Sequence, residues 1–238
     1  MKKYYIYIKT VLFLLILGGV FSFTSHRNKK RIVSDVKVSF SNEDNLFLTH
    51  QMVNNLLVQN ENHVVNKQKT LINLQELEHN VELHPMVSSA EVSVGITGDL
   101  QVSVKQRKPI ARMFNVLDVV YIDTKGEEMP LSKNYSARVL IIDNKNSMIT
   151  HKEIFPLIKK INDDTFLKKL IIAIRKDKQG YWFLTRFNQQ KILLGNLKNS
   201  KRKLKKLKVF YGYIEKDSLA HTFKKIDLQY NNQVVCSK

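Results

Sequence analysis

Cysteine is almost absent from this 238-residue chain, which contains only Cys236. A single cysteine excludes an intrachain disulfide and leaves no CxxC pair for zinc or redox chemistry. The seven histidines never fall into an HxxxH or HExxH spacing, so the sequence gives no support to a metal site. A glycine-rich phosphate loop, a GxSxG elbow and an SxxK nucleophile motif are also missing. These absences predict a protein that is not an enzyme, uses no cofactor and is held together by packing.

Acidic residues are scarce, with 21 Asp and Glu against 39 Lys and Arg, which gives a net charge of +18. Such a surplus attracts nucleic acid, lipid head groups or an anionic cell-wall polymer. A lysine-rich solubilising surface produces the same surplus, and we favour this simpler interpretation. The densest basic segment, residues 198–208, contains no interleaved aromatic residues, which disfavours nucleic acid. Contacts to an anionic surface there would come from Lys201, Lys205 and Lys208, with a solvated helix face as the alternative.

Long apolar runs are limited to one segment, Tyr4 to Phe23, in which Lys9 is the single charge. About 20 helical residues at roughly 1.5 Å each span roughly 30 Å, the thickness of the hydrocarbon core of a bilayer. A cleaved signal peptide is the alternative, but Phe23 interrupts the small residues that would form a cleavage site. We therefore predict a retained transmembrane helix. Basic residues flank it on both sides, so charge alone does not decide its orientation.

A small domain is predicted beyond the anchor, after a polar linker over 24–31. Residues 36–40 alternate as in a half-buried strand, and two helical patterns follow, the second with Asn73 at its N-cap. That second helix should end before Pro85, because proline disfavours helical geometry in the preceding residue. A hairpin with one apolar face completes a β-α-α-β-β order over 32–108.

A mixed β-domain is predicted over 109–238. A helix after Thr150 should start late or bend, because Pro156 lacks an amide. Residues 197–215 switch to a helical period, and Phe223 to Tyr230 form the last strand. The predicted fold class of the whole chain is α+β. The other strands are expected at about 110–114, 119–123, 138–143, 167–174, 181–187 and 192–194.

Seven short motifs carry a family resemblance. They are Asn73 to Leu77, His84 to Val87, Ala90 to Val92, Leu100 to Val104, Gln106 to Ala111, Tyr121 to Gly126 and Ile226 to Tyr230. In this order and spacing they resemble the POTRA domain and the domain that follows it in the cell-division family FtsQ, called DivIB in some bacteria. The resemblance covers nearly the whole chain. Gln229 departs from it, since arginine is usual at that place.

The resemblance implies a bitopic protein of the inner (cytoplasmic) membrane, with residues 1–3 in the cytoplasm and the main body in the periplasm, at the division septum. It implies a non-enzymatic scaffold that binds FtsB- and FtsL-like partners and helps control the septal peptidoglycan synthase. A terminal strand can offer an unpaired edge to an extended partner segment, and we expect no later segment to cover that edge. The partner-binding residues expected on this basis are Phe223, Lys225, Ile226, Gln229, Tyr230 and Asn232.

Three other functions have their own signatures. A POTRA-containing envelope assembly or secretion factor would carry a long series of barrel strands, for which the residues after Pro109 are too few. An envelope hydrolase would need a catalytic motif that the sequence lacks. A binder of anionic cell-wall polymer would show salt-sensitive binding to the polymer without any protein partner.

Overall fold

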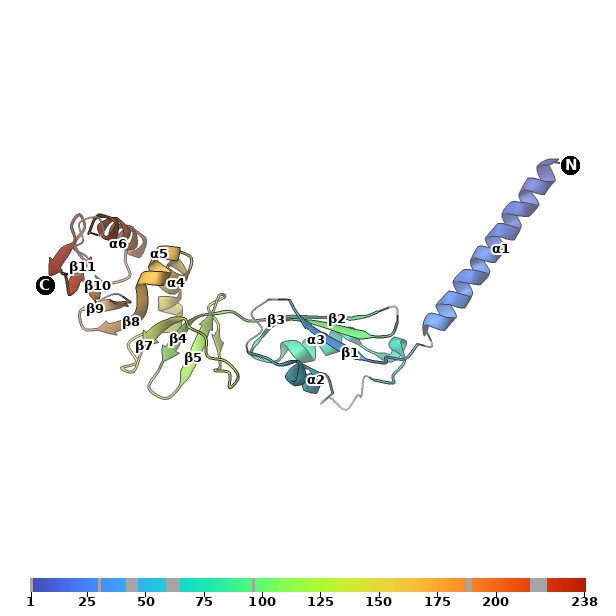
Figure 1. Cartoon of the computed structure of the whole chain (residues 1–238), viewed down its shortest axis with the longest axis horizontal. Helices are drawn as coiled ribbons and strands as arrows, with labels where there is room; N and C mark the ends of the chain where they lie inside the picture. The colour runs from blue at the N-terminus through green and yellow to red at the C-terminus, as the bar shows by residue number, and fades with distance from the viewer. Residues whose placement is uncertain are drawn as a thin grey trace. The chain divides into compact units, whose positions relative to one another are not determined.

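The computed structural model describes residues 2–29, 31–41, 47–58, 65–95, 97–186, 190–214 and 222–238 (Figure 1). The chain divides into two compact units, Met1–Gln106 and Arg107–Lys238. Among the described residues, the first unit holds a three-stranded sheet and the second a nine-stranded sheet. An apolar amino-terminal helix precedes both sheets. The predicted α+β fold class is confirmed.

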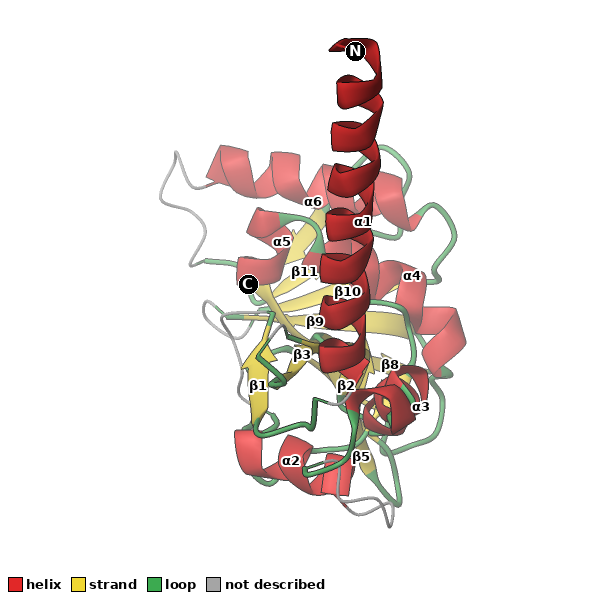
Figure 2. Ribbon diagram, turned by 90° about the vertical axis from the view of Figure 1, so that its right-hand side faces the viewer, coloured by secondary structure: helices red, strands yellow, loops and turns green. Residues whose placement is uncertain are grey.

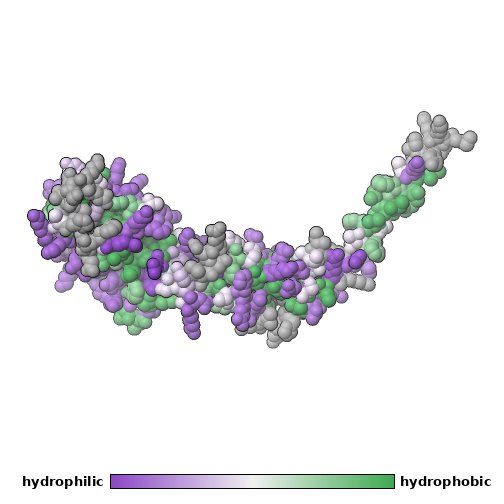
Figure 3. All heavy atoms as spheres, viewed as in Figure 1, coloured by the Kyte–Doolittle hydropathy of each residue, from purple (hydrophilic) through white to green (hydrophobic). Residues whose placement is uncertain are grey.

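Helix α1 (Lys2–Lys29) contains a stretch, Tyr7–Arg27, that is long and apolar enough to cross a membrane. None of that stretch is buried against the rest of the protein, and apolar side chains cover it on the face seen in Figure 3. The predicted linker over 24–31 is wrong for residues 24–29, which continue the helix. This short stretch contains neither glycine nor proline, so nothing in it breaks the helical ladder.

The first unit packs two helices against its sheet. Strand β3 lies in the centre, parallel to β1 and antiparallel to β2. Val53 and Val81 from the helices and Val102 from β3 are fully buried. Asn73 accepts a hydrogen bond from the amide of Glu76 at 3.3 Å, so the predicted N-cap is confirmed. The elements are β1 (Val36–Phe40), α2 (His50–Val58), η1 (Lys69–Leu71), α3 (Leu74–Glu82), β2 (Val87–Val94) and β3 (Leu100–Gln106).

Two carboxylates of α3 cover the outer edge of β2. Glu82 accepts a hydrogen bond from the amide of Ala90 at 3.0 Å, and Glu78 accepts one from the amide of Val92 at 2.8 Å. The spacing matches because residues four apart on a helix and two apart on a strand are each separated by roughly 6–7 Å. The two carboxylates therefore occupy donors that a bare edge strand would offer to another chain.

The second unit is one mixed sheet in the order β12-β11-β10-β9-β8-β7-β4-β5-β6. Its helices α4, α5 and α6 lie on one side of this sheet (Figures 1 and 2). Strands β8, β9 and β10 form an antiparallel meander. The elements are β4 (Pro109–Phe114), β5 (Val119–Asp123), β6 (Glu128–Met129), β7 (Leu140–Asp143), α4 (His151–Asn162), α5 (Thr165–Leu170), β8 (Ile171–Asp177), β9 (Gly180–Thr185), β10 (Lys191–Gly195), α6 (Ser200–Ile214), β11 (Lys225–Asp227) and β12 (Val235–Ser237).

One row of apolar side chains crosses this sheet beneath the helices. Ile142, Ile174, Phe183, Ile192 and Ile226 are successive register partners, and each is at most 1% exposed. Burying a large apolar side chain contributes about 1.5–3 kcal/mol, so this row alone contributes on the order of 10 kcal/mol before conformational entropy is subtracted. The core therefore runs continuously from β7 to β11.

Helix α4 begins at His151, directly after Thr150, so of the two predicted outcomes the late start is wrong. Pro156 lies inside the helix and removes one intrahelical hydrogen bond. Burial of one apolar face offsets that loss, because the side chains on this face are at most 2% exposed. They are Ile154, Leu157, Ile158 and Ile161.

The predicted strand over 167–174 is wrong in its first half, where helix α5 extends to Leu170. Asp164 starts this helix by accepting hydrogen bonds from the amides of Phe166 and Leu167, each at 3.0 Å. The segment from Leu167 to Ile174, which is apolar except for Lys168 and Lys169, fits both a strand and a helix segment, and the aspartate cap favours the helix in its first half.

Candidate functional site: the carboxy-terminal hairpin

Strands β11 and β12 form a short antiparallel hairpin at one end of the nine-stranded sheet (Figure 1). Ile226 of β11 is the register partner of Cys236 of β12. The prediction that no later segment covers the terminal strand is wrong, because residues 235–237 return along it. The predicted strand over 223–230 also shortens to Lys225–Asp227. In the described part of the chain, β12 is therefore the outer strand at this end.

Hydrogen-bond directions show which main-chain groups of β12 point away from the sheet. The amide of Leu228 donates to the carbonyl of Leu193 in β10 at 2.9 Å. Successive residues of a strand direct these groups to alternate sides, so those of Asp227 point toward β12. The amide and carbonyl of Val235, the register partner of Asp227, therefore point back toward β11. The amide and carbonyl of Cys236 consequently face outward.

Two of the six expected partner-binding residues pack into the unit. Ile226 is fully buried, so its side chain is not available to a partner. Phe223 is half-buried, with its ring centroid 6.3 Å from that of Phe210. The sheet alternation that points Ile226 toward the helices explains its burial. Leu228 is also fully buried and packs in the core.

The other four expected residues reach the surface. Tyr230 is 51% exposed, the largest apolar surface of the hairpin. The ammonium of Lys225 lies 5.2 Å from the ring centroid of Trp182, and Asn232 accepts a hydrogen bond from Arg202 at 2.9 Å. Gln229 completes the group. The structure therefore gathers these four residues around one exposed turn and its neighbouring strand.

Two glycines allow Gln229 to lie against the sheet. Gly195 has a φ of +72°, and a Cβ there would stand 2.5 Å from the Gln229 amide nitrogen. A Cβ on Gly180 would stand 2.5 Å from the main chain of Gly195. The side-chain amide of Gln229 also donates a hydrogen bond to the main-chain carbonyl of Gln179 at 3.4 Å. The base of the hairpin is thus built by close backbone approaches that side chains would block.

A buried glutamine holds the segment that enters β11. Gln190 is 1% exposed and donates to the carbonyl of Phe223 at 2.7 Å. Its side-chain oxygen accepts a hydrogen bond from the hydroxyl of Tyr211 at 2.6 Å. A helix, the start of β10 and the entry to β11 are thereby joined.

Helix α6 directs part of its positive charge toward main-chain carbonyls of β10, the loop after it and the hairpin, rather than toward solvent. Lys203 donates to the carbonyls of Leu194 and Asn196, each at 2.9 Å, and Lys206 donates to carbonyls of the hairpin turn. Burial lowers the pKa of both lysines below the usual range. The basic composition of the helix gave no signal that separates these lysines from the others, so sequence reasoning missed them.

The three lysines expected at an anionic surface differ from one another. Lys208 pairs with Asp164 at 2.5 Å, and this hydrogen bond lowers the pKa of the Asp164 carboxyl. Lys201 and Lys205 are exposed on the helix. Whether either of them contacts a polymer stays a prediction.

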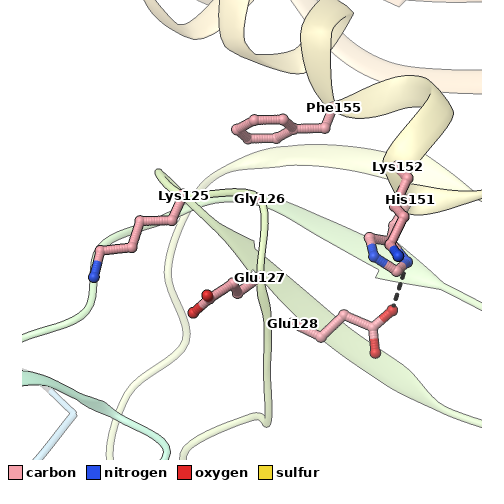
Figure 4. A pocket seen from close by; sticks show the side chains of 7 residues that line it. All are labelled: Lys125, Gly126, Glu127, Glu128, His151, Lys152 and Phe155. Atoms are coloured by element: carbon pink, nitrogen blue, oxygen red, sulfur yellow. Dashed lines mark ion pairs between the residues drawn. The ribbon is translucent and has the colours of Figure 1, made fainter.

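A hollow of about 520 Å³ lies elsewhere in the second unit (Figure 4). His151 pairs with Glu128 at 3.0 Å, and the ring of Phe155 stands over Gly126. No serine, threonine or cysteine lines it, so it lacks a hydroxyl or thiol nucleophile. Across the residues that the structure describes, no three His, Cys, Asp or Glu side chains gather as metal ligands. The lining residues are Lys125, Gly126, Glu127, Glu128, His151, Lys152 and Phe155.

Comparison with known families gives two matches. A family model described as FtsQ/DivIB, C-terminal related, matches residues 108–237, and a POTRA-like domain model matches residues 32–105. The first match covers more than half of the chain and includes both strands of the terminal hairpin. No curated protein matches the chain.

Proposed function

This chain belongs to the FtsQ/DivIB family, and on that premise we propose that it is a non-enzymatic scaffold of the divisome that binds FtsB- and FtsL-like partners and helps control septal peptidoglycan synthesis. The observation that carries the proposal is the family match over residues 108–237, which includes the hairpin with its outward strand. Affinity purification of the tagged full-length protein from its own cells tests it. Recovery of divisome partners is expected, and their absence from a stable, membrane-located sample would contradict the scaffold role.

The proposed location is the inner membrane at the division septum, with a single span and residues 24–238 outside the cytoplasm. Helix α1 supports one span by its length and composition. A reporter enzyme that is active only outside the cytoplasm, fused after Lys238, should be active. A stable but inactive fusion would reverse the topology.

The absence of catalysis is part of the proposal. POTRA-like and FtsQ/DivIB-related domains are generally scaffolds, and the hollow of the second unit pairs its histidine with a carboxylate rather than with a nucleophile. The purified protein should release no fragments from peptidoglycan. Reproducible turnover, abolished by one substitution that leaves the fold intact, would overturn this part.

The proposed partner edge is β12, where an extended segment would pair with the outward main-chain groups of Cys236. Side chains of Lys225, Gln229, Tyr230 and Asn232 would then set specificity. Tyr230→Ala should cost on the order of 2 kcal/mol, roughly a thirtyfold loss of affinity, if the exposed ring is a hot spot. Titration of the full-length protein and this variant with an FtsB-like segment measures the loss.

A further inference from the structure

A single ammonium group gathers the segment that reverses the chain between β11 and β12. Nζ of Lys206 donates to the carbonyl of Leu228 at 3.2 Å and to that of Gln233 at 2.9 Å, and it also donates to the carbonyl of Tyr230. A lysine ammonium has three donors, so each one meets a carbonyl of a different residue. The three acceptors span residues 228–233, which is most of the connection between the two strands.

The hairpin has few other means of holding its register. Strands β11 and β12 share three register pairs, and so short a ladder is weak by itself. The residues between the strands form no helix or strand. The main-chain amide of Gln229 donates a hydrogen bond to the side chain of Asp227 at 2.9 Å. This local turn orients only the first residues of the connection. Arg202 adds one hydrogen bond to the side chain of Asn232 at 2.9 Å, whereas Lys206 holds three main-chain carbonyls of the connection. The return of the chain to β12 therefore depends mainly on the contacts of Lys206.

The charge of Lys206 is held by carbonyl dipoles. In the described part of the chain, the ion pairs found do not include Lys206. Burial lowers its pKa, Arg202 lowers it further, and Asp227 opposes them. A neutral side chain of similar length cannot replace these three charge-assisted hydrogen bonds.

We propose that Lys206 is the positioning residue of the partner-binding edge, holding β12 in place without itself contacting the partner. The proposal rests on the proposed function, because it takes β12 as the edge to which the partner adds. It assigns a specific role to a lysine that sequence composition groups with its solvated neighbours.

The experiment compares variants of the full-length protein in lipid nanodiscs. Lys206→Met removes the ammonium and keeps the length of the side chain, and Lys205→Met removes an exposed lysine one residue away as the matched control. Hydrogen exchange of peptides covering residues 235–238 reports the hairpin, and titration with an FtsB-like segment reports the edge. Fluorescence of Trp182, the single tryptophan, verifies that the second unit is folded.

Lys206→Met should accelerate exchange of the Val235 and Ser237 amides about tenfold or more and should weaken segment binding by a similar factor. Lys205→Met should change neither. Lys206→Arg, which retains a charged donor, should recover part of both effects. If Lys206→Met prevents folding, the milder Lys206→Gln is measured for the same acceleration.

Unchanged exchange in a folded Lys206→Met protein would overturn the proposal, as would faster exchange with unchanged binding. If the wild-type protein binds no segment, the proposed function fails by itself. In that case the exchange data alone decide whether Lys206 positions β12, since they require no partner.

Discussion

Asp123 offers the sharpest test of how the second unit begins. Its side chain is 3% exposed and accepts a hydrogen bond from Nε of Arg107 at 2.9 Å. Its other oxygen accepts from the amides of Lys125 at 2.8 Å and Glu127 at 2.9 Å, which shapes the turn after β5. Asp123→Ala removes all of these interactions at once.

The expected cost follows from the burial of the pair. Removing one partner of a buried ion pair typically costs about 3–5 kcal/mol. The guanidinium of Arg107 is 13% exposed and lies 3.5 Å from the exposed carboxylate of Glu127. This second ion pair would compensate only in part for the loss of the Asp123 carboxylate. We therefore expect a loss of about 3 kcal/mol, at the lower end of that range. Asp123→Asn should cost roughly half as much, because its amide oxygen still accepts hydrogen bonds.

Urea unfolding of residues 31–238, followed by the fluorescence of Trp182, measures this loss in the second unit alone. Trp182 is the single tryptophan and is 7% exposed. With a denaturant slope of about 2 kcal/mol per M, the midpoint should fall by about 1.5 M. Leu117→Ala, at the tip of the β4–β5 turn where the side chain is 97% exposed, is the control and should change stability by less than about 0.5 kcal/mol. Equal shifts for both variants would refute the reasoning.

Three further predictions concern the two units. Burial lowers the pKa of His84 in the folded protein, so the unfolded chain binds the proton first as the pH falls. The contribution of His84 to the stability of the first unit should therefore be constant above the unfolded pKa of about 6.5. It should be lost as the pH drops through the folded pKa. Thermal melts by circular dichroism should show this loss, and His84→Gln should remove it. Replacing Glu78 and Glu82 together by alanine uncovers β2 and should cause self-association in sedimentation velocity, whereas a strictly monomeric double variant would contradict the covering role. Ile158→Ala, at a fully buried position, should cost about 2–5 kcal/mol in the urea assay, and a loss below about 1 kcal/mol would contradict its place in the core.

Local signals in the sequence predicted much of the fold. The alternation over 36–40 and the cap at Asn73 are confirmed, because strand periodicity and capping act over a few residues. Pro156 misled because its local cost is outweighed by burial of the apolar face of its own helix against the sheet. Asp164 caps a helix over a segment whose pattern of apolar residues did not distinguish a helix from a strand.

The candidate site was only partly predictable. The motif ending at Tyr230 pointed to the end of the chain where the hairpin lies, but β12 is only three residues long, too short for sequence alternation to reveal a strand. Its pairing depends on a turn held by Lys206, a contact between residues more than twenty positions apart. Sequence periodicity does not encode such a contact, so both the covered strand and its positioning residue became visible only in the structure.

Strand addition to β12 is the central claim, and one pair of variants at Cys236 tests it directly. Cys236→Pro removes the outward amide, whereas Cys236→Ala keeps it and accounts for loss of the thiol. Because the Cys236 amide points away from β11, proline should leave the β11–β12 pairing in place. Titration with an FtsB-like segment should give wild-type affinity for Cys236→Ala and at least a tenfold loss, about 1.4 kcal/mol, for Cys236→Pro. Wild-type affinity in a folded Cys236→Pro protein would contradict the claim and place the partner on another surface.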